Sequence, residues 1–125
     1  RGIALEIVLP DPQLRLQADR VLLEQVLINL VLNAIDALSG RPAPRITLTA
    51  TAEADRTVLS VADNGAGMDA QTQEQVFVPF FTTKKNGSGI GLSLCKQIVL
   101  LHKGSIQLRS VPGTGTVVTL TLGAG

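Results

Sequence analysis

The chain has 125 residues with a formal net charge of +1, and 45% of its residues are apolar, which is enough for one compact domain. With three Phe and no Trp or Tyr, it lacks the aromatic platforms that a single-stranded nucleic acid site needs, so we expect no nucleic acid partner. It has no signal-peptide pattern and no apolar run long enough to span a bilayer. We therefore expect a cytoplasmic domain without direct membrane contact, which leaves open an inner-membrane anchor elsewhere in the parent protein.

The charges are unevenly placed along the chain. Residues 1–74 carry six basic and ten acidic groups, whereas residues 75–125 carry five basic groups and no acid. A basic second half suits an anion such as a phosphate chain. Chance segregation on a solvated surface explains the same pattern, so the charge distribution alone does not establish an anion-binding site.

Hydrophobic periodicity predicts strands and helices in a regular order. The expected elements are strands at 3–9 and 14–18, a long helix at 20–38, strands at 45–52 and 56–63, a short helix at 70–75, a long helix at 89–102, and strands at 105–110 and 116–122. This order predicts an α+β two-layer sandwich, in which helices cover one face of a mixed, mostly antiparallel sheet. We assign residues 1–122 to the domain and residues 123–125 to a flexible tail.

The first long helix is almost entirely apolar except for one polar stripe. Gln25, Asn29, Asn33 and Asp36 fall within roughly 80° of the helix circumference. A helix this apolar should be buried, and its stripe should then face polar partners. Amide oxygens suit Mg²⁺, which prefers oxygen ligands and bridges to phosphates. A solvent-facing stripe or a structural hydrogen-bond network remains an equal alternative.

A glycine loop follows the strand at 56–63. Asp63 ends that strand, and its carboxylate can accept a hydrogen bond from the exocyclic amine of a base. Gly65 and Gly67 would let the backbone approach a flat ligand. The alternative interpretation is an ordinary Asn-Gly turn.

A second glycine loop, residues 87–92, opens the second long helix. Free backbone N–H groups and the helix dipole favour an anion at such a position, and Lys84 and Lys85 lie just upstream. The spacing of the glycines fits neither the dinucleotide-binding fingerprint nor the Walker phosphate loop.

In combination, these segments resemble the ATP-binding catalytic domain of histidine protein kinases, within the superfamily that includes gyrase, mismatch-repair ATPases and the heat-shock chaperone. The resemblance rests on five boxes in the family's order: Asn29–Asp36, Asp63–Gly67, Phe77–Lys84, Gly87–Leu92 and Gly113–Thr116. The short segment around Phe80-Phe81-Thr82-Thr83-Lys84 resembles the lid of the subfamily that includes nitrogen-regulation sensors.

The resemblance implies a left-handed α/β sandwich that binds ATP and Mg²⁺ beneath a mobile lid. It implies that Asn33 ligates Mg²⁺, Asp63 reads the adenine amine and Thr116 helps close the adenine pocket. Asn33 and Lys84 are the catalytic residues that we expect. Asp36 stands where many members carry a phosphate-contacting Lys, a contact that Lys84 would replace. The expected ATP-binding residues are Asn29, Asn33, Asp36, Asp63, Gly65, Gly67, Phe80, Thr83, Lys84, Gly87, Ser88, Gly89, Ile90, Gly91, Leu92 and Thr116.

The chemistry expected from the resemblance is phosphoryl transfer rather than hydrolysis. Hydrolysing members carry a Glu where this chain has Asn29, and an amide cannot take a proton from water. The implied acceptor is a His on a separate dimerisation and phosphoacceptor hairpin, with a response regulator receiver domain as the next partner. We expect His102, at a helix C-terminus, to be structural. An anti-sigma-type serine kinase and a non-catalytic nucleotide-responsive module remain alternatives.

Overall fold

The computed structural model describes residues 3–8, 20–53, 56–78 and 91–123. In chain order, its elements are β1 (Ala4–Val8), α1 (Arg20–Ala37), β2 (Arg45–Glu53), β3 (Arg56–Asp63), α2 (Ala70–Gln75), α3 (Gly91–Leu101), β4 (Ser105–Val111) and β5 (Gly115–Gly123). The expected elements are therefore confirmed, with ends shifted by one or two residues. The strand expected at 14–18 lies outside the described residues.

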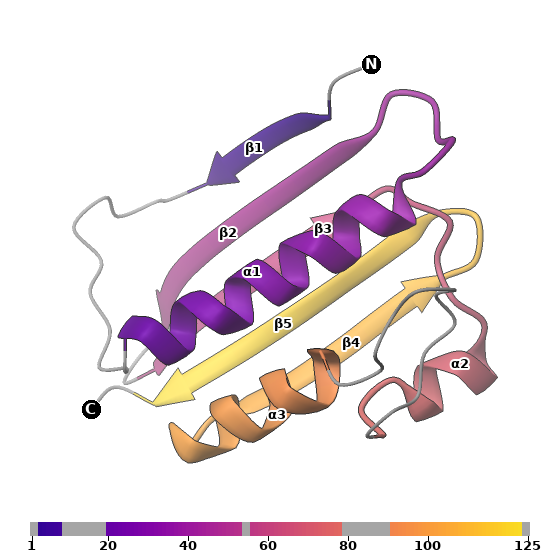
Figure 1. Ribbon diagram of the computed structural model, residues 1–125. Coiled ribbons are helices and arrows are strands. Elements are labelled where there is room, and N and C mark those ends of the chain that lie inside the picture. Colours follow the sequence, from indigo (N-terminus) through magenta and orange to yellow (C-terminus); the bar gives the residue numbers. More distant parts are fainter. Residues whose placement is uncertain (1–2, 9–19, 54–55, 79–90, 124–125) are drawn as a thin grey trace.

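The strands form one sheet in the order β1-β2-β3-β5-β4. β1 runs parallel to β2, whereas the other neighbouring pairs are antiparallel. Figure 1 shows α1 and α3 lying across the same face of this sheet, with α2 beyond one end of it. The mixed sheet with helices on one face confirms the predicted α+β two-layer sandwich.

The core lies between the sheet and the two long helices. Side chains spaced by four along α1 point at the sheet, as expected for one face of a helix. They pack with α3 and with alternate residues of β2, β3 and β5. The buried cluster is Val26, Leu30, Ala34, Leu38, Ile46, Leu59, Val61, Cys95, Ile98, Val99, Val118, Leu120 and Leu122.

Cys95 is fully buried in this cluster, where it is a small core residue. Burial raises the pKa of its thiol to about 11, although a hydrogen bond from the Asn29 side chain acts in the opposite direction. The thiol is therefore protonated at neutral pH, and its Sγ donates a weak hydrogen bond to the Val26 carbonyl oxygen at 3.7 Å.

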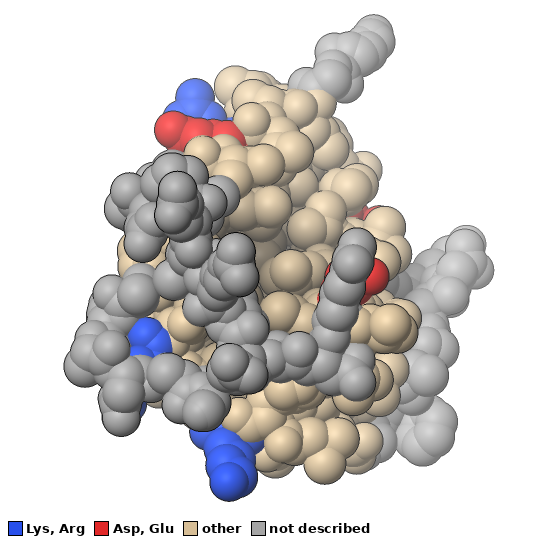
Figure 2. All heavy atoms as spheres, turned by 90° about the vertical axis from the view of Figure 1, so that its left-hand side faces the viewer, with Lys and Arg blue, Asp and Glu red and all other residues tan. Residues whose placement is uncertain are grey.

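The prediction that α1 is buried around most of its circumference is wrong. Val21, Ile28, Leu32 and Ile35 are exposed on the side of α1 opposite the buried stripe. The reason is architectural, because a two-layer sandwich has one sheet and covers only one side of each helix. Figure 2, seen from the end where α1 begins, shows mainly uncharged surface among the residues that the structure describes.

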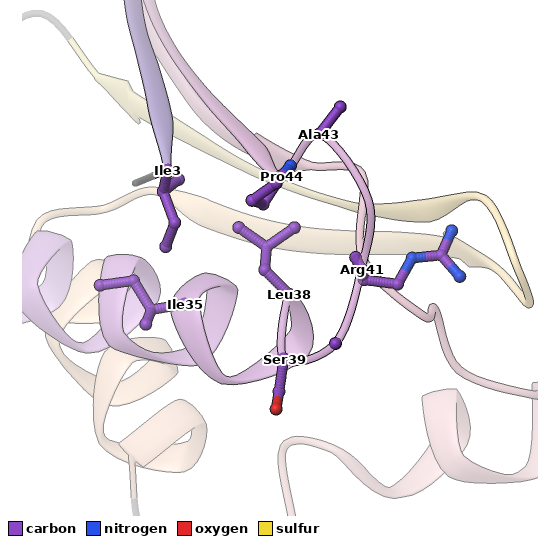
Figure 3. Close-up of a pocket in the computed structure, with 8 residues that line it drawn as sticks. Ile3, Ile35, Leu38, Ser39, Arg41, Ala43 and Pro44 are labelled. Carbon is purple, nitrogen blue, oxygen red and sulfur yellow. The ribbon is translucent and has the colours of Figure 1, made fainter. Parts of the chain in front are cut away.

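A cavity of about 410 Å³ lies where β1 begins and α1 ends. Ile3 approaches it from just before β1, Ile35 from α1, Leu38 from the turn after α1, and Pro44 from the loop before β2 (Figure 3). Arg41 also lines the cavity, but its guanidinium points away from these apolar side chains. Figure 1 places this region at the N-terminal edge of the sheet, away from α3.

Candidate nucleotide-binding site

Three polar side chains form a row across the sheet on its helix-covered face. Asp63 on β3 pairs with Thr116 on β5, and Thr116 pairs with Ser110 on β4. Val61 and Val118, two residues away on the same strands, belong to the core. Since side chains alternate between the two faces of a strand, the row continues the core face to the end of the sheet.

The Asp63 carboxylate is half-buried and held in a fixed position. Its Oδ1 accepts a hydrogen bond from the Gly65 backbone N–H at 2.8 Å. Burial raises the pKa of Asp63 above its ordinary value, while the Gly65 and Thr116 backbone N–H groups act in the opposite direction. A desolvated acceptor of this kind suits an N–H donor on a ligand.

Ser110 links the row to the loop before α2. Its Oγ accepts from the Met68 backbone N–H at 2.7 Å, donates to the Gly115 carbonyl oxygen at 3.0 Å and lies 2.8 Å from Thr116 Oγ1. No local sequence pattern indicates a role for Ser110, because its partners lie up to 42 residues away along the chain.

The side chain of Gln73 anchors α2 to the free edge of β4. Its Nε2 donates to the carbonyl oxygens of Met68, at 3.0 Å, and Ser110, at 2.8 Å, and its Oε1 accepts from the Ser110 N–H at 3.2 Å. The amide thus pairs with an edge strand as another strand would. The Asp69 side chain caps the helix by accepting from the Thr72 N–H at 2.7 Å.

The loop after β3 is fixed by side chains that the sequence analysis assigned no role. Asn64 Oδ1 accepts from the Arg45 N–H at 2.7 Å, and Asn64 Nδ2 donates to the Ala43 carbonyl oxygen at 2.9 Å. Arg41 donates from Nε to the Asn64 carbonyl oxygen at 3.3 Å and from Nη2 to the Gly113 carbonyl oxygen at 2.8 Å. These bonds join three loops around the end of the sheet where Asp63 lies.

The glycines of the first loop lie against the protein's own backbone. A Cβ on Gly65 would overlap the Ala37 carbonyl oxygen, and one on Gly67 would overlap the Val111 carbonyl oxygen. Gly67 also has φ +74°, which favours glycine. The structure thus gives both glycines a packing reason, whereas their contact with a nucleotide stays a prediction.

The polar stripe of α1 is partly buried. Asn29 and Asn33 are half-buried, whereas Gln25 and Asp36 are exposed. The Asn29 side chain lies close enough to the Cys95 thiol of α3 to influence its pKa, so this part of the stripe faces the second helix. Contact of Asn29 with a nucleotide stays a prediction.

In the described part of this site, magnesium would fit with Asn33 as a ligand and with phosphates and water as further ligands. In the part of the chain that the structure describes, no three His, Cys, Asp or Glu side chains gather into a metal site. A neutral amide such as Asn33 is an oxygen ligand that Mg²⁺ uses together with phosphates and water. The donor set therefore fits a nucleotide-bound Mg²⁺ rather than a metal held by the protein alone.

His102 lies at the C-terminal end of α3. Its Nδ1 is 2.8 Å from the Ile98 carbonyl oxygen, and since a carbonyl can only accept, the ring nitrogen donates. This contact agrees with the predicted structural role at a helix terminus.

Part of the predicted site falls outside the described residues: Phe80, Thr83, Lys84, Gly87, Ser88, Gly89 and Ile90. Gly91 and Leu92, the last two residues of the second glycine box, form the first turn of α3. No described helix is long and apolar enough to cross a membrane.

Comparison with known proteins accounts for this combination of a sheet, an Asp-ended strand and an Asn-bearing helix. Residues 18–125 match the family described as histidine kinase-, DNA gyrase B-, and HSP90-like ATPase. The chain belongs to this family. The match covers every box on which the predicted resemblance rests, from Asn29 to Thr116.

Relatives within this ATPase family are sensor histidine kinases. The chain is 43% identical over 107 residues to the signal transduction histidine-protein kinase AtoS of Escherichia coli. The aligned region covers 86% of this chain and 17% of AtoS. It is 38% identical over 122 residues to the sensor histidine kinase ZraS of Salmonella typhi, covering 98% of this chain and 26% of ZraS. The chain thus spans about a quarter or less of these two proteins.

Solved structures agree with the family assignment. The nucleotide-free catalytic domain of histidine kinase ThkA superposes with a TM-score of 0.85 at 34% identity, covering 97% of this chain and 78% of that one. ThkA in complex with the response regulator TrrA gives a TM-score of 0.82 at 31% identity, covering 98% of this chain and 34% of that one. The chain therefore has the fold of a histidine kinase catalytic domain.

Proposed function

We propose that this chain binds Mg·ATP and donates the γ-phosphoryl group to a histidine on a separate dimerisation and phosphoacceptor hairpin of the same sensor kinase. The observation that carries the proposal is the fixed, half-buried Asp63 carboxylate beside Thr116. In a member of this ATPase family, such an acceptor suits the adenine amine. Family membership and the kinase relatives support the reaction type.

The nucleotide would lie between the end of the sheet and the two long helices. Asp63 would accept from the adenine amine, and Thr116 would close the same pocket. Asn33 would hold Mg²⁺ through its amide oxygen, and Mg²⁺ would neutralise phosphate charge during transfer. Lys84 and the second glycine box, whose last two residues form the first turn of α3, would contact the phosphates.

Phosphoryl transfer is favoured over hydrolysis by the chemistry of α1. Asn29 lies beside the Cys95 thiol, and its amide cannot accept a proton from water at neutral pH. Glu24 is exposed and lies roughly 100° around the helix from Gln25, away from the stripe. Neither residue is suited to activate a water molecule.

The response regulator is the proposed partner for the next step. ThkA, a similar kinase, has been crystallised in complex with its response regulator TrrA. We extend this pairing to the kinase that contains the present chain, and we propose that the receiver domain takes the phosphoryl group from the hairpin histidine.

Calorimetric titration tests the nucleotide half of this proposal. Asn33→Ala should weaken ATP binding roughly tenfold or more in the presence of Mg²⁺ and much less in its absence. Gln25→Ala, an exposed position on the same stripe, is the matched control and should bind as the parent does. Equal affinity of Asn33→Ala and the parent in Mg²⁺ would remove Asn33 from the metal site.

A further inference from the structure

The Ser110 hydroxyl lies at the centre of a small hydrogen-bonded cluster beside the Asp63–Thr116 pair. Its three contacts, at 2.7 Å, 3.0 Å and 2.8 Å, are with the Met68 N–H, the Gly115 carbonyl oxygen and Thr116 Oγ1. Thr116 is itself buried. The proton positions in this cluster therefore determine what Thr116 presents to a ligand.

Hydrogen-bonding capacity assigns each proton. A serine hydroxyl has one proton to donate and two lone pairs with which to accept. The Gly115 carbonyl oxygen can only accept, so the Ser110 proton goes to it. The contact between the two hydroxyls then uses the proton of Thr116, and the second lone pair of Ser110 receives the Met68 N–H. Every hydrogen-bonding valence of Ser110 is used in this arrangement.

This arrangement fixes the hydrogen-bonding role of the Thr116 hydroxyl toward a ligand. Because its proton points at Ser110, Thr116 Oγ1 keeps only lone pairs for other partners. Asp63, its neighbour in the same row, is also an acceptor, and Gly65 holds its carboxylate in place at 2.8 Å. The end of the sheet therefore presents two adjacent acceptors and no side-chain donor from this pair.

We propose that Ser110 is a specificity-determining residue that makes Thr116 a hydrogen-bond acceptor, so that the pocket selects a purine with a 6-amino group over one with a 6-oxo group. Ser110 acts through Thr116 and is a positioning residue. Two acceptors complement N–H donors, whereas they leave an oxo oxygen unpaired beside other oxygens. This inference rests on the proposed ATP-binding function.

A purely structural role for Ser110 makes a different prediction. Ser110 also holds Met68 and Gly115, so its loss could loosen the loops at the end of the sheet. Such loosening would weaken the binding of every nucleotide alike. If Ser110 instead sets the direction of the Thr116 hydrogen bond, its loss should change the ratio of the affinities for ATP and inosine triphosphate. The two purines differ at the 6-position and in the N1 proton.

The test is a double-mutant cycle measured by calorimetry with ATP and inosine triphosphate. The proteins are the parent chain, Ser110→Ala, Thr116→Val and the double variant. Ser110→Ala should lower the ATP preference roughly fivefold to tenfold, since the released Thr116 hydroxyl can donate to the oxo group. In the Thr116→Val background, Ser110→Ala should leave the ratio unchanged.

Two further variants serve as controls. Ser105→Ala removes an exposed hydroxyl from the same strand and should keep the parental ratio. Ser110→Thr retains the hydroxyl and should keep that ratio too. If Ser110→Ala does not fold by circular dichroism, Thr116→Val replaces it in the test and should itself lower the ATP preference.

Three results would overturn the proposal. The first is an equal loss of affinity for both nucleotides in Ser110→Ala. The second is a change in the ratio of the two affinities that Ser110→Ala still causes in the Thr116→Val background. The third is a Thr116→Val variant that keeps the parental ratio. A parent chain that binds neither nucleotide would instead overturn the proposed function, and this inference with it.

Discussion

Gly115 lies directly against Asp63, and a Cβ added to Gly115 would overlap the Asp63 carbonyl oxygen. The same Cβ would lie 3.0 Å from the Asn64 Cα. Gly115 also has φ +147°, a conformation that is essentially restricted to glycine. The glycine therefore allows β5 to approach β3 at the point where the candidate site begins.

Gly115→Ala should destabilise the domain strongly. Backbone overlap and an unfavourable φ together should cost about 2–4 kcal/mol in the free energy of unfolding, measured by urea denaturation. Gly113→Ala is the matched control, because Gly113 has φ +81° but no heavy atom near its would-be Cβ. It should cost only about 1–2 kcal/mol, the penalty for a left-handed residue. Equal losses would mean that the contact with Asp63 contributes nothing.

Asp63→Asn should remove a pH dependence from the stability of the free domain and weaken ATP binding. The pKa of Asp63 is raised by burial, so the folded state binds a proton more readily than the unfolded state does. The parent should therefore lose stability as pH rises through the range just above the ordinary aspartate pKa, about 4. Asp63→Asn should lack this loss, and urea denaturation across pH measures it. A parent that gains stability over this range would contradict the assigned sign.

The same substitution should weaken ATP binding by roughly tenfold to a hundredfold, which corresponds to one hydrogen bond to a charged group. The amide retains an oxygen for the Gly65 N–H but presents an NH₂ group where the carboxylate presented a second acceptor. Calorimetry at neutral pH measures the change. An unchanged affinity would show that Asp63 does not read the base.

Leu30 and Leu32 should differ sharply although both lie in the apolar run of α1. Leu30 is 2% exposed in the core, whereas Leu32 is 52% exposed on the opposite side. Leu30→Ala should cost about 2–5 kcal/mol in the free energy of unfolding, and Leu32→Ala less than about 1 kcal/mol. Comparable losses in thermal or chemical denaturation would indicate that the exposed side of α1 is covered in the folded chain.

The sequence predicted what local periodicity and family motifs encode. Strand alternation and helical spacing predict the described elements to within one or two residues. The motifs single out Asp63 and Thr116 but do not show that the two residues pair across the sheet. Periodicity shows which residues share a helix face, but not whether a second layer covers that face. For this reason the exposure of Leu32 was not foreseen.

Contacts between residues far apart along the chain could not be predicted from the sequence either. Arg41 bonds to Gly113 across 72 residues, and Gln73 bonds to Ser110 across 37. Nothing in local composition connects these positions. The glycine loops carried a recognisable signal, but the sequence could not show that Gly65 and Gly67 approach the protein's own backbone.

The most direct test of the central claim follows labelled γ-phosphate from ATP. The chain is incubated with Mg²⁺ and γ-labelled ATP, first alone and then with the separately produced histidine hairpin of the same kinase. We expect no stable label on the chain alone and an acid-labile label on the hairpin histidine when both are present. Label on His102, label on a serine of a supplied protein substrate, or tight ATP binding without any transfer to the hairpin would contradict the assignment as a histidine kinase catalytic domain that acts on a separate acceptor.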